Sequence, residues 1–338
     1  MALQLRDKFG RPVRDLRISV IDKCNFRCPY CMPAEIFGAD YNFLSKPELL
    51  SNDELFRLAR LFVDLGVTKL RITGGEPLLR PQLPELISRL TALEGVDDVA
   101  LTTNAFYLRK HAQALKSAGL SRLTISLDSL DDEVFRQLNG FRSGVAEVLD
   151  GMAAAIEAGF EQLKINCVVK RGVNDHTIVD LARHFKGSGH IVRYIEYMDV
   201  GNLNGWRLDD VVTQDEILAL IDAEFPLEAV PPNYPGEVAN RFRYVDGSGE
   251  IGVIASVTKP FCGNCTRARL SSAGEYYTCL FGVEGADLRA PLRSGATDDE
   301  IREMIAGVWR HRVDQYSELR TSFTQLPAKG AEMYRLGG

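Results

Sequence analysis

Short β-branched runs alternate with helical stretches as far as residue 198, and this alternation constrains the fold more than any other feature. The runs are 15–21, 68–74, 98–104, 122–128, 162–170 and 191–198. Between them, 52–66 (capped by Asn52) and 146–160 carry apolar residues at the helical period. Strands separated by helices are joined by right-handed crossovers, which makes the sheet parallel. Six such units form most of an eight-unit barrel or an open sheet, and we predict an α/β fold with a partial (βα)6 barrel of the TIM type.

The pattern changes after residue 225. Residues 226–237 are proline-rich and indicate a linker, and 241–256 indicate a hairpin that turns at Asp246-Gly247. One further helix is predicted at 298–313. We therefore predict two domains, a barrel at 1–225 and a C-terminal region at 226–338 that closes the barrel and carries a second cysteine set.

Composition excludes several classes of protein. The chain has 338 residues, 45% of them hydrophobic, which is enough for a large core. Its formal net charge of -6 argues against a protein that coats nucleic acid or an anionic membrane. The N-terminus is charged without an apolar run, and no window is long enough to span a bilayer. We expect a cytoplasmic protein with reduced cysteines.

Three cysteines, Cys24, Cys28 and Cys31, follow the first predicted strand. Thiolates suit zinc or iron–sulfur clusters, but a structural zinc site closes with four ligands, and no histidine lies nearby in the sequence. A [4Fe–4S] cluster held by three cysteines leaves one iron open to a small molecule. We predict such a cluster; the alternative is zinc with a distant fourth ligand.

A second set, Cys262, Cys265 and Cys279, again has three thiols and no neighbouring histidine. The same argument predicts a second [4Fe–4S] cluster with an open iron, and the alternative is a zinc knuckle. Cys167 could complete such a knuckle, but its alternation with Ile165 and Val169 suits a buried core residue.

Basic residues alternate with apolar ones on several of the predicted strands. They are Arg17, Lys69, Arg71, Lys164 and Arg193, and Arg267 and Arg269 beside the second cysteine set show the same spacing. Such side chains point either to solvent or into the barrel. Cations gathered in one interior would need a polyanion to neutralise them, and a triphosphate fits. We find no Walker A sequence, so side chains would hold the phosphates.

The spacing CxxxCxxC after the first strand of a βα repeat resembles the radical S-adenosylmethionine (SAM) enzymes. The resemblance implies that the open iron binds SAM and that an electron from the cluster cleaves it to methionine and a 5′-deoxyadenosyl radical. It also implies a set of SAM contacts on matching positions. They are Tyr30, Gly74, Gly75, Glu76, Ser126 and Met198.

Further stretches resemble the branch of that superfamily that acts on GTP in molybdenum cofactor biosynthesis. They are 15–33, 71–80, 102–105, 124–129, 164–174, 193–201, 262–281 and the final Gly337-Gly338. This resemblance implies that the radical removes hydrogen from C3′ of GTP and that C3′ then bonds to C8 of guanine. It places guanine on the open iron of the second cluster and the terminal glycines in the active site.

The resemblance also assigns roles to residues and partners. GTP contacts would be Arg17, Lys69, Arg71, Thr102, Lys164, Arg193, Arg267, Ala268 and Arg269, of which Arg17, Arg267 and Arg269 would be catalytic. An external one-electron reductant is implied, with cyclic pyranopterin monophosphate synthase taking the product. The protein would be a monomer or homodimer.

Two other hypotheses are kept. A peptide-modifying radical SAM enzyme would share the first cysteine set but usually carries more C-terminal cysteines. A zinc-stabilised binding protein would catalyse nothing.

Overall fold

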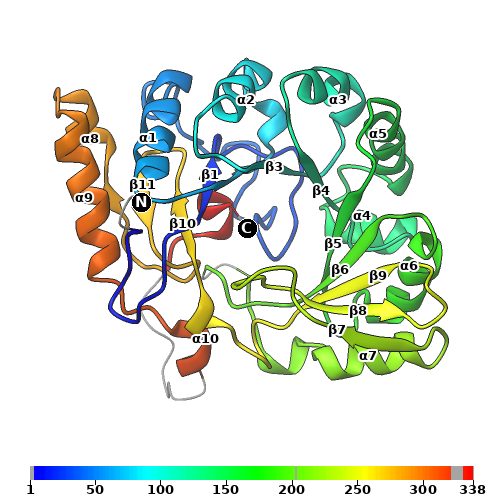
Figure 1. The fold of residues 1–338 in the computed structure, drawn as a ribbon. Coiled ribbons are helices and arrows are strands. Elements are labelled where there is room, and N and C mark those ends of the chain that lie inside the picture. The colour runs from blue at the N-terminus through cyan, green and yellow to red at the C-terminus, as the bar shows by residue number, and fades with distance from the viewer. Residues whose placement is uncertain (1–3, 202–203, 321–329, 338) are drawn as a thin grey trace.

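The predicted strands form the centre of one curled parallel sheet. A computed structural model describes residues 4–201, 204–320 and 330–337 (Figure 1). The strands are β1 (Asp15–Ser19), β2 (Lys69–Thr73), β3 (Asp98–Thr103), β4 (Arg122–Ser126), β5 (Leu163–Val169) and β6 (Ile191–Glu196). They lie side by side in chain order, and each pairs in parallel with the next. The sheet curls around a central opening, so the predicted partial barrel is confirmed.

Helices cover the outside of this sheet (Figure 1). They are α1 (Asn52–Asp64), α2 (Leu83–Thr91), α3 (Leu108–Ser117), α4 (Asp132–Leu138), α5 (Val145–Glu157), α6 (Ile178–Phe185) and α7 (Gln214–Asp222). The 3₁₀ helices η1 (Pro77–Leu79), η2 (Asp175–Thr177) and η3 (Leu208–Asp210) lie in the connections. Within the described residues, no helix combines the length and apolar character that crossing a membrane requires.

The cap of helix α1 differs from the prediction. Ser51 precedes the helix, and its Oγ accepts a hydrogen bond from the backbone N–H of Glu54. The Glu54 carboxylate accepts the Ser51 backbone N–H in return, at 2.7 Å. Asn52 was predicted as the cap and is instead the first helical residue, because this reciprocal pair satisfies the free N–H groups of the first turn.

The C-terminal region extends both edges of the barrel sheet. Its strands are β7 (Leu227–Val230), β8 (Asn240–Tyr244), β9 (Glu250–Ile254), β10 (Arg267–Leu270), β11 (Glu275–Tyr277) and β12 (Ala286–Asp287). Strand β10 pairs in parallel with β1, and β9 pairs in parallel with β6. Its helices are η4 (Cys262–Asn264), α8 (Arg289–Arg293), α9 (Asp298–Arg310), α10 (Tyr316–Leu319) and α11 (Met333–Leu336).

One part of the C-terminal prediction is confirmed and one is wrong. Strands β8 and β9 form the predicted antiparallel hairpin, and Gly247 in its turn has a φ of +76° that favours glycine. The linker predicted at 226–237 is partly a strand, because β7 pairs antiparallel with β8. Its pairing partner lies beyond the proline-rich stretch, so local composition did not reveal it.

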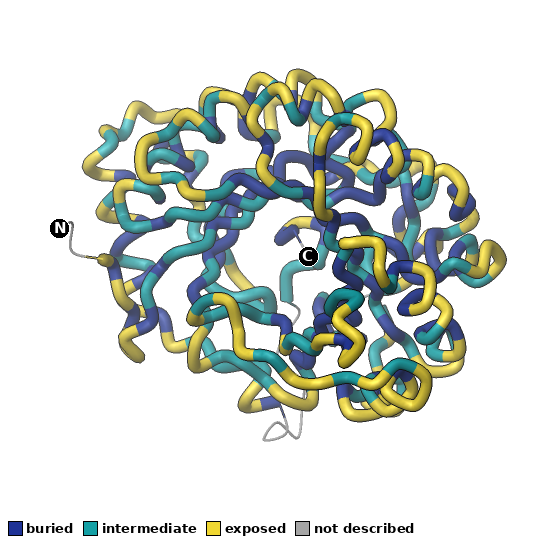
Figure 2. Tube along the Cα trace, turned by 45° about the vertical axis from the view of Figure 1, so that its right-hand side comes forward, coloured by how far each residue is buried: buried dark blue, intermediate teal, exposed yellow. Residues whose placement is uncertain are grey.

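The two faces of the barrel strands differ in chemistry. On β1, Leu16 and Ile18 are fully buried in the core beneath the helices, while Arg17 lies on the opposite, inner face. The residues along the strands are mostly buried or partly buried, and exposed residues gather on the outer rim (Figure 2). The last described residues, 333–337, lie inside the ring (Figure 1). The strands therefore present charged side chains to the interior and apolar side chains to the helices.

Candidate active site

A cavity of about 310 Å³ lies inside the barrel, and both cysteine triplets line it. The first triplet follows the C-terminal end of β1, whereas Cys265 lies two residues before β10 begins. Because β1 and β10 are parallel, with Asp15 opposite Arg267, the two triplets lie at opposite ends of the strands. Strand β11 returns antiparallel to β10 and brings Cys279 to the same end as Cys265. A ligand in the cavity therefore lies between two groups of thiols.

The turn after β2 packs tightly against the segment that leads into the first triplet. A Cβ on Gly75 would lie 2.2 Å from the backbone oxygen of Lys23, so only glycine fits this approach. Glu76 is buried and accepts hydrogen bonds from Thr103 Oγ1 at 2.6 Å and from the backbone N–H of Asn104 at 2.9 Å. Burial raises the pKa of Glu76 to about 7. The segment 74–77 (GGEP) thus contacts both the end of β3 and the residues just before Cys24.

The residues predicted to contact SAM lie around this end of the cavity. All of them line it, and they are Tyr30, Gly74, Gly75, Glu76, Ser126 and Met198. The Tyr30 hydroxyl donates to Asp128 Oδ2 at 2.6 Å, which fixes the ring inside the cysteine loop. Asp128 is buried, and burial raises its pKa to about 6.

The second triplet lies beside arginines. Burial raises the pKa of the Cys265 thiol, but the charges of Arg267 and Arg312 outweigh it and hold the pKa at about 7, below its usual value. A thiol with a lowered pKa is more readily a thiolate, the form that binds metal. This holds for Cys265 alone, because burial raises the pKa of the Cys279 thiol in the same triplet to about 12.

The donors of both triplets fit an iron–sulfur cluster, because its irons bind cysteine thiolates. All six cysteines of the two triplets are free thiols. Cys167 is buried in the hydrophobic core, with its thiol donating to the Asp128 carbonyl at 3.3 Å.

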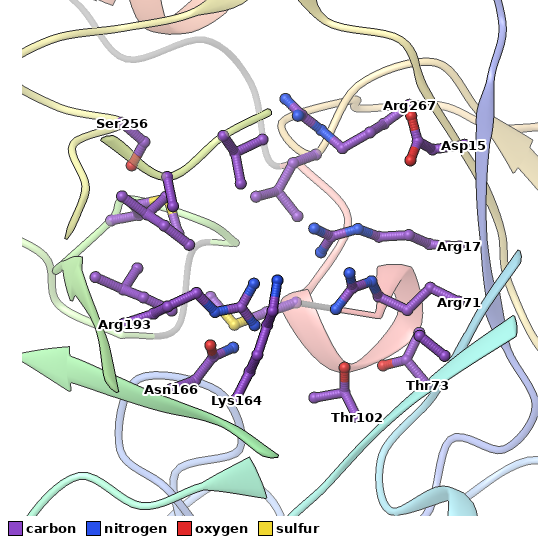
Figure 3. A pocket seen from close by; sticks show the side chains of 18 of the residues that line it. Asp15, Arg17, Arg71, Thr73, Thr102, Lys164, Asn166, Arg193, Ser256 and Arg267 are labelled. Carbon is purple, nitrogen blue, oxygen red and sulfur yellow. The ribbon is translucent and has the colours of Figure 1, made fainter. Parts of the chain in front are cut away.

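The predicted cations converge on the cavity (Figure 3). All of them line it, and they are Arg17, Lys69, Arg71, Lys164, Arg193, Arg267 and Arg269. Arg17 is paired in register with Arg71 on one side and Arg269 on the other. Burial, followed by repulsion from Arg269 and Arg71, lowers the pKa of Arg17 well below its ordinary value. Confining these like charges is unfavourable unless an anion joins them.

Several polar atoms in the cavity wall are buried without a hydrogen-bond partner among the described residues. They are Thr102 Oγ1, Asn166 Oδ1, Arg193 Nε and Ser256 Oγ. Unpaired buried polar atoms are unfavourable, which indicates that a polar ligand completes this wall.

Asn166, Ser256 and Arg122 also line the cavity and were missed by the sequence analysis. Asn166 follows Lys164 by two residues on one strand face, a signal that could have identified it. Ser256 carries no local signal, because it lies near the cavity only through the pairing of β9 with β6.

One predicted GTP contact, Ala268, and the predicted glycine tail differ from the other predicted site residues. Ala268 is fully buried in the hydrophobic core on the face of β10 opposite Arg267 and Arg269, so its side chain does not line the cavity. The Gly337 carbonyl accepts hydrogen bonds from Arg269 Nη1 at 2.7 Å and from Arg17 Nη1 at 3.4 Å. Gly338 lies outside the described residues.

Known families match nearly the whole chain. The Radical SAM superfamily matches residues 18–185, and the Molybdenum Cofactor Synthesis C family matches residues 190–318. A GTP 3′,8-cyclase of Xanthomonas axonopodis pv. citri is 51% identical over 340 residues, covering 100% of both chains. That of Acidothermus cellulolyticus is 53% identical over 324 residues, covering 95% of this chain and 90% of the relative. That of Staphylococcus haemolyticus is 50% identical over 341 residues, covering 100% of both.

Solved structures share the fold at much lower sequence identity. Streptococcus suis SuiB bound to S-adenosylmethionine superposes with a TM-score of 0.63 at 16% identity. The match covers 89% of this chain and 69% of SuiB. This likeness bears on the fold alone.

Proposed function

The chain belongs to the GTP 3′,8-cyclase family of the radical SAM superfamily, and we propose that its two cysteine triplets hold two [4Fe–4S] clusters at opposite ends of one cavity. The enzyme converts GTP to (8S)-3′,8-cyclo-7,8-dihydroguanosine 5′-triphosphate, the first step of molybdenum cofactor biosynthesis, and uses SAM with an iron–sulfur cluster. One observation carries the two-cluster proposal: both triplets and all the predicted cations line the same cavity.

At the first end, Cys24, Cys28 and Cys31 would hold the cluster. With SAM bound, this cluster would supply the electron that generates the 5′-deoxyadenosyl radical. Tyr30, Gly74, Gly75, Glu76, Ser126 and Met198 surround this end and would orient SAM. Because Glu76 is engaged with Thr103 and Asn104, we propose that it holds the turn in place for this contact.

At the second end, Cys262, Cys265 and Cys279 would hold the other cluster, with guanine at its open iron. The cations between the two ends would bind the triphosphate, since arginine forks match phosphate oxygens. Among them, Arg17, Arg267 and Arg269 are proposed to stabilise the substrate radical. Thr102, and the backbone at Ala268, would contact GTP.

The cavity wall would set the position of the ribose. Unpaired polar atoms of Thr102 and Asn166 lie between the cations in Figure 3. Thr102 Oγ1 could donate to or accept from the ribose and Asn166 Oδ1 could accept from a ribose hydroxyl, and such hydrogen bonds would hold C3′ close to the 5′-deoxyadenosyl radical. Gly337, which reaches Arg17 and Arg269, would exclude water from that side together with Gly338.

The partners follow from this chemistry. An external one-electron reductant would serve the first cluster, and cyclic pyranopterin monophosphate synthase would take the product. Reduced thiolates favour a cytoplasmic enzyme, which we propose as a monomer or homodimer without nucleic-acid or membrane partners.

Anaerobic purification tests the two-cluster proposal. We expect a brown protein with about eight irons and matching sulfide per chain. Incubation with SAM and dithionite should give 5′-deoxyadenosine only when GTP is present. A colourless protein with two zincs would refute all cluster chemistry, and 5′-deoxyadenosine formed on a peptide but not on GTP would favour the peptide-modifying hypothesis.

A further inference from the structure

Four charged side chains form a network beside the second cysteine triplet. It joins Asp7 and Arg11, near the N-terminus, to Arg312 and Asp314, after helix α9. Arg11 Nε donates to Asp7 Oδ2 at 2.5 Å, and Arg312 Nη1 reaches the same oxygen at 3.4 Å. Asp7, Arg11 and Arg312 are each less than 8% exposed. Two guanidinium groups face two carboxylates, so the network has no net formal charge.

The network holds the backbone of the cysteine loop on both sides. Arg11 Nη1 donates to the carbonyl oxygen of Cys262 at 2.8 Å. Arg312 Nη1 donates to the carbonyl oxygen of Cys265 at 2.7 Å. The loop's own hydrogen bond, from the Cys265 N–H to the Cys262 carbonyl, is 3.1 Å long. Arg11 therefore holds the first residue of η4, and Arg312 holds the residue that follows η4.

The same network also holds the segment that carries the third cysteine. Thr278, which precedes Cys279, donates its hydroxyl to Asp314 Oδ2 at 2.5 Å. Arg11 Nη1 donates to the Asp314 carbonyl at 2.8 Å, so this contact is linked to the cysteine loop. All three cysteine-bearing segments are therefore connected through one set of charges, of which Asp7, Arg11 and Arg312 are buried and Asp314 is partly exposed.

The N-terminal part of the network is itself rigid. Asp7 Oδ1 accepts the backbone N–H groups of Phe9 and Arg11, both at 2.9 Å, which closes a turn. Trp309 Nε1 donates to the Arg11 carbonyl at 3.1 Å, and the Arg312 guanidinium lies 4.6 Å from the Trp309 ring centre. Asp7 and Arg11 thus reach the C-terminal region through the Arg11 carbonyl as well as through their side chains.

We propose that Arg11 and Arg312, held by Asp7, are positioning residues that set the spacing of Cys262, Cys265 and Cys279 for the second cluster. This inference rests on the proposed function, because it takes the second triplet as a cluster site. The network has no net formal charge, although Arg312 and Asp314 also line the cavity. Its role is to fix three thiols before the cluster binds, which reduces the entropy lost on binding.

Arginine geometry is essential to this role. One Arg11 guanidinium serves three acceptors, on Asp7, Cys262 and Asp314, in a planar fork. A lysine at this position keeps the charge but cannot make this set of contacts. We therefore expect Arg11→Lys to be as defective as Arg11→Met, whereas a purely electrostatic role would let lysine rescue.

The test compares anaerobically reconstituted full-length variants. In Arg11→Met, Arg11→Lys and Arg312→Met we expect about four irons per chain instead of about eight. The first cluster should remain, seen as an electron paramagnetic resonance signal that changes when SAM is added. In the cluster-free proteins, hydrogen exchange at residues 262–266 should be about tenfold faster than in wild type. Asp298→Asn is the matched control, because Asp298 pairs helix α9 with Arg57 and Arg60 and does not contact the loop.

The outcomes separate this inference from the function it rests on. Eight irons with unchanged exchange in the arginine variants would overturn it, as would rescue by lysine or equal loss of both clusters. If wild type itself takes up only four irons, the two-cluster proposal fails. The rate of hydrogen exchange at residues 262–266 in the cluster-free variants and wild type then decides whether the network orders the loop. If the arginine variants do not fold, Thr278→Val replaces them, and the inference is overturned unless it selectively lowers second-cluster occupancy.

Discussion

Lys164 lies among arginines in the cavity, and these surroundings determine its protonation. Burial, and then the charges of Arg193, Arg122 and Arg71, lower its pKa from 10.5 to about 8. Its charged form is therefore less stable in the folded protein than in the unfolded chain. The unfolded chain binds this proton more tightly, so Lys164 reduces the stability of the ligand-free protein at neutral pH.

Replacing Lys164 with methionine should stabilise the ligand-free protein at pH 7. We expect the free energy of unfolding to rise by about 1–2 kcal/mol, since partial exposure of the side chain weakens the full effect of the shift. The advantage should shrink as the pH rises from about 8 towards 10.5, because the folded protein then loses the Lys164 proton. It should vanish above 10.5, where the unfolded chain has lost that proton as well. Urea unfolding at several pH values measures this.

The same variant should bind GTP more weakly, by about tenfold or more, because a charged hydrogen-bond donor to phosphate is lost. Isothermal titration with GTP checks this. A variant that is destabilised at pH 7 and keeps full GTP affinity would contradict both the pKa direction and the phosphate role.

Helix α11 places the glycine that follows it, Gly337, against two arginines that line the cavity. Tyr334 packs with Met32 and Phe37 in a second, smaller hydrophobic cluster near the first cysteine loop. Its hydroxyl lies 3.1 Å from that of Tyr41. This anchor leaves Gly337 beside Thr73, where a Cβ would lie 2.1 Å from the threonine Cγ2. A residue without a side chain is required there.

Gly337→Ala should lower GTP turnover by about tenfold or more while iron content stays unchanged. Both the close contact with Thr73 and the φ of +66° oppose a side chain at this position. Gly330→Ala is the matched control, because its nearest neighbour lies at an ordinary 3.7 Å. Rates of 5′-deoxyadenosine formation measure the effect. Deletion of Gly337 and Gly338 should abolish cyclisation with both clusters intact, and full turnover by that truncation would refute the role of the tail.

The chain folds around one continuous sheet. Strand order runs β12-β11-β10-β1-β2-β3-β4-β5-β6-β9-β8-β7, so C-terminal strands flank the six barrel strands on both sides. Without them, β1 and β6 would become unpaired edges, and strand edges left open promote aggregation. Helix α9 also packs against α1, with Arg57 and Arg60 both bonded to Asp298. The C-terminal strands and helix α9 therefore complete the packing of the barrel.

A fragment of residues 1–225 should fail to fold on its own. We expect aggregation or a non-cooperative thermal transition, because two strand edges and the core beneath α9 become exposed. Size-exclusion chromatography and circular dichroism on the fragment and the full chain measure this. A monomeric fragment that unfolds cooperatively would show that the predicted barrel domain is autonomous.

The sequence was sufficient for the features that short spacings control. Strand and helix positions follow from side-chain periods, whereas the cluster sites at Cys24–Cys31 and Cys262–Cys279 stay a prediction from ligand count. The alternation of Arg17 and Arg71 with apolar neighbours limited each cation to one of two faces, because side chains along a strand alternate. These properties need no knowledge of distant residues.

Only the tertiary structure decided which face those cations occupy and what lies opposite them. The parallel pairing of β10 with β1 places the two triplets at opposite ends of the cavity, and the pairing of β9 with β6 brings Ser256 to its wall. Arg312 reaches Asp7 across 305 residues of sequence. Such contacts depend on how the whole sheet closes, and the free energy of that packing is shared among many residues distant in the chain, so no local pattern encodes it.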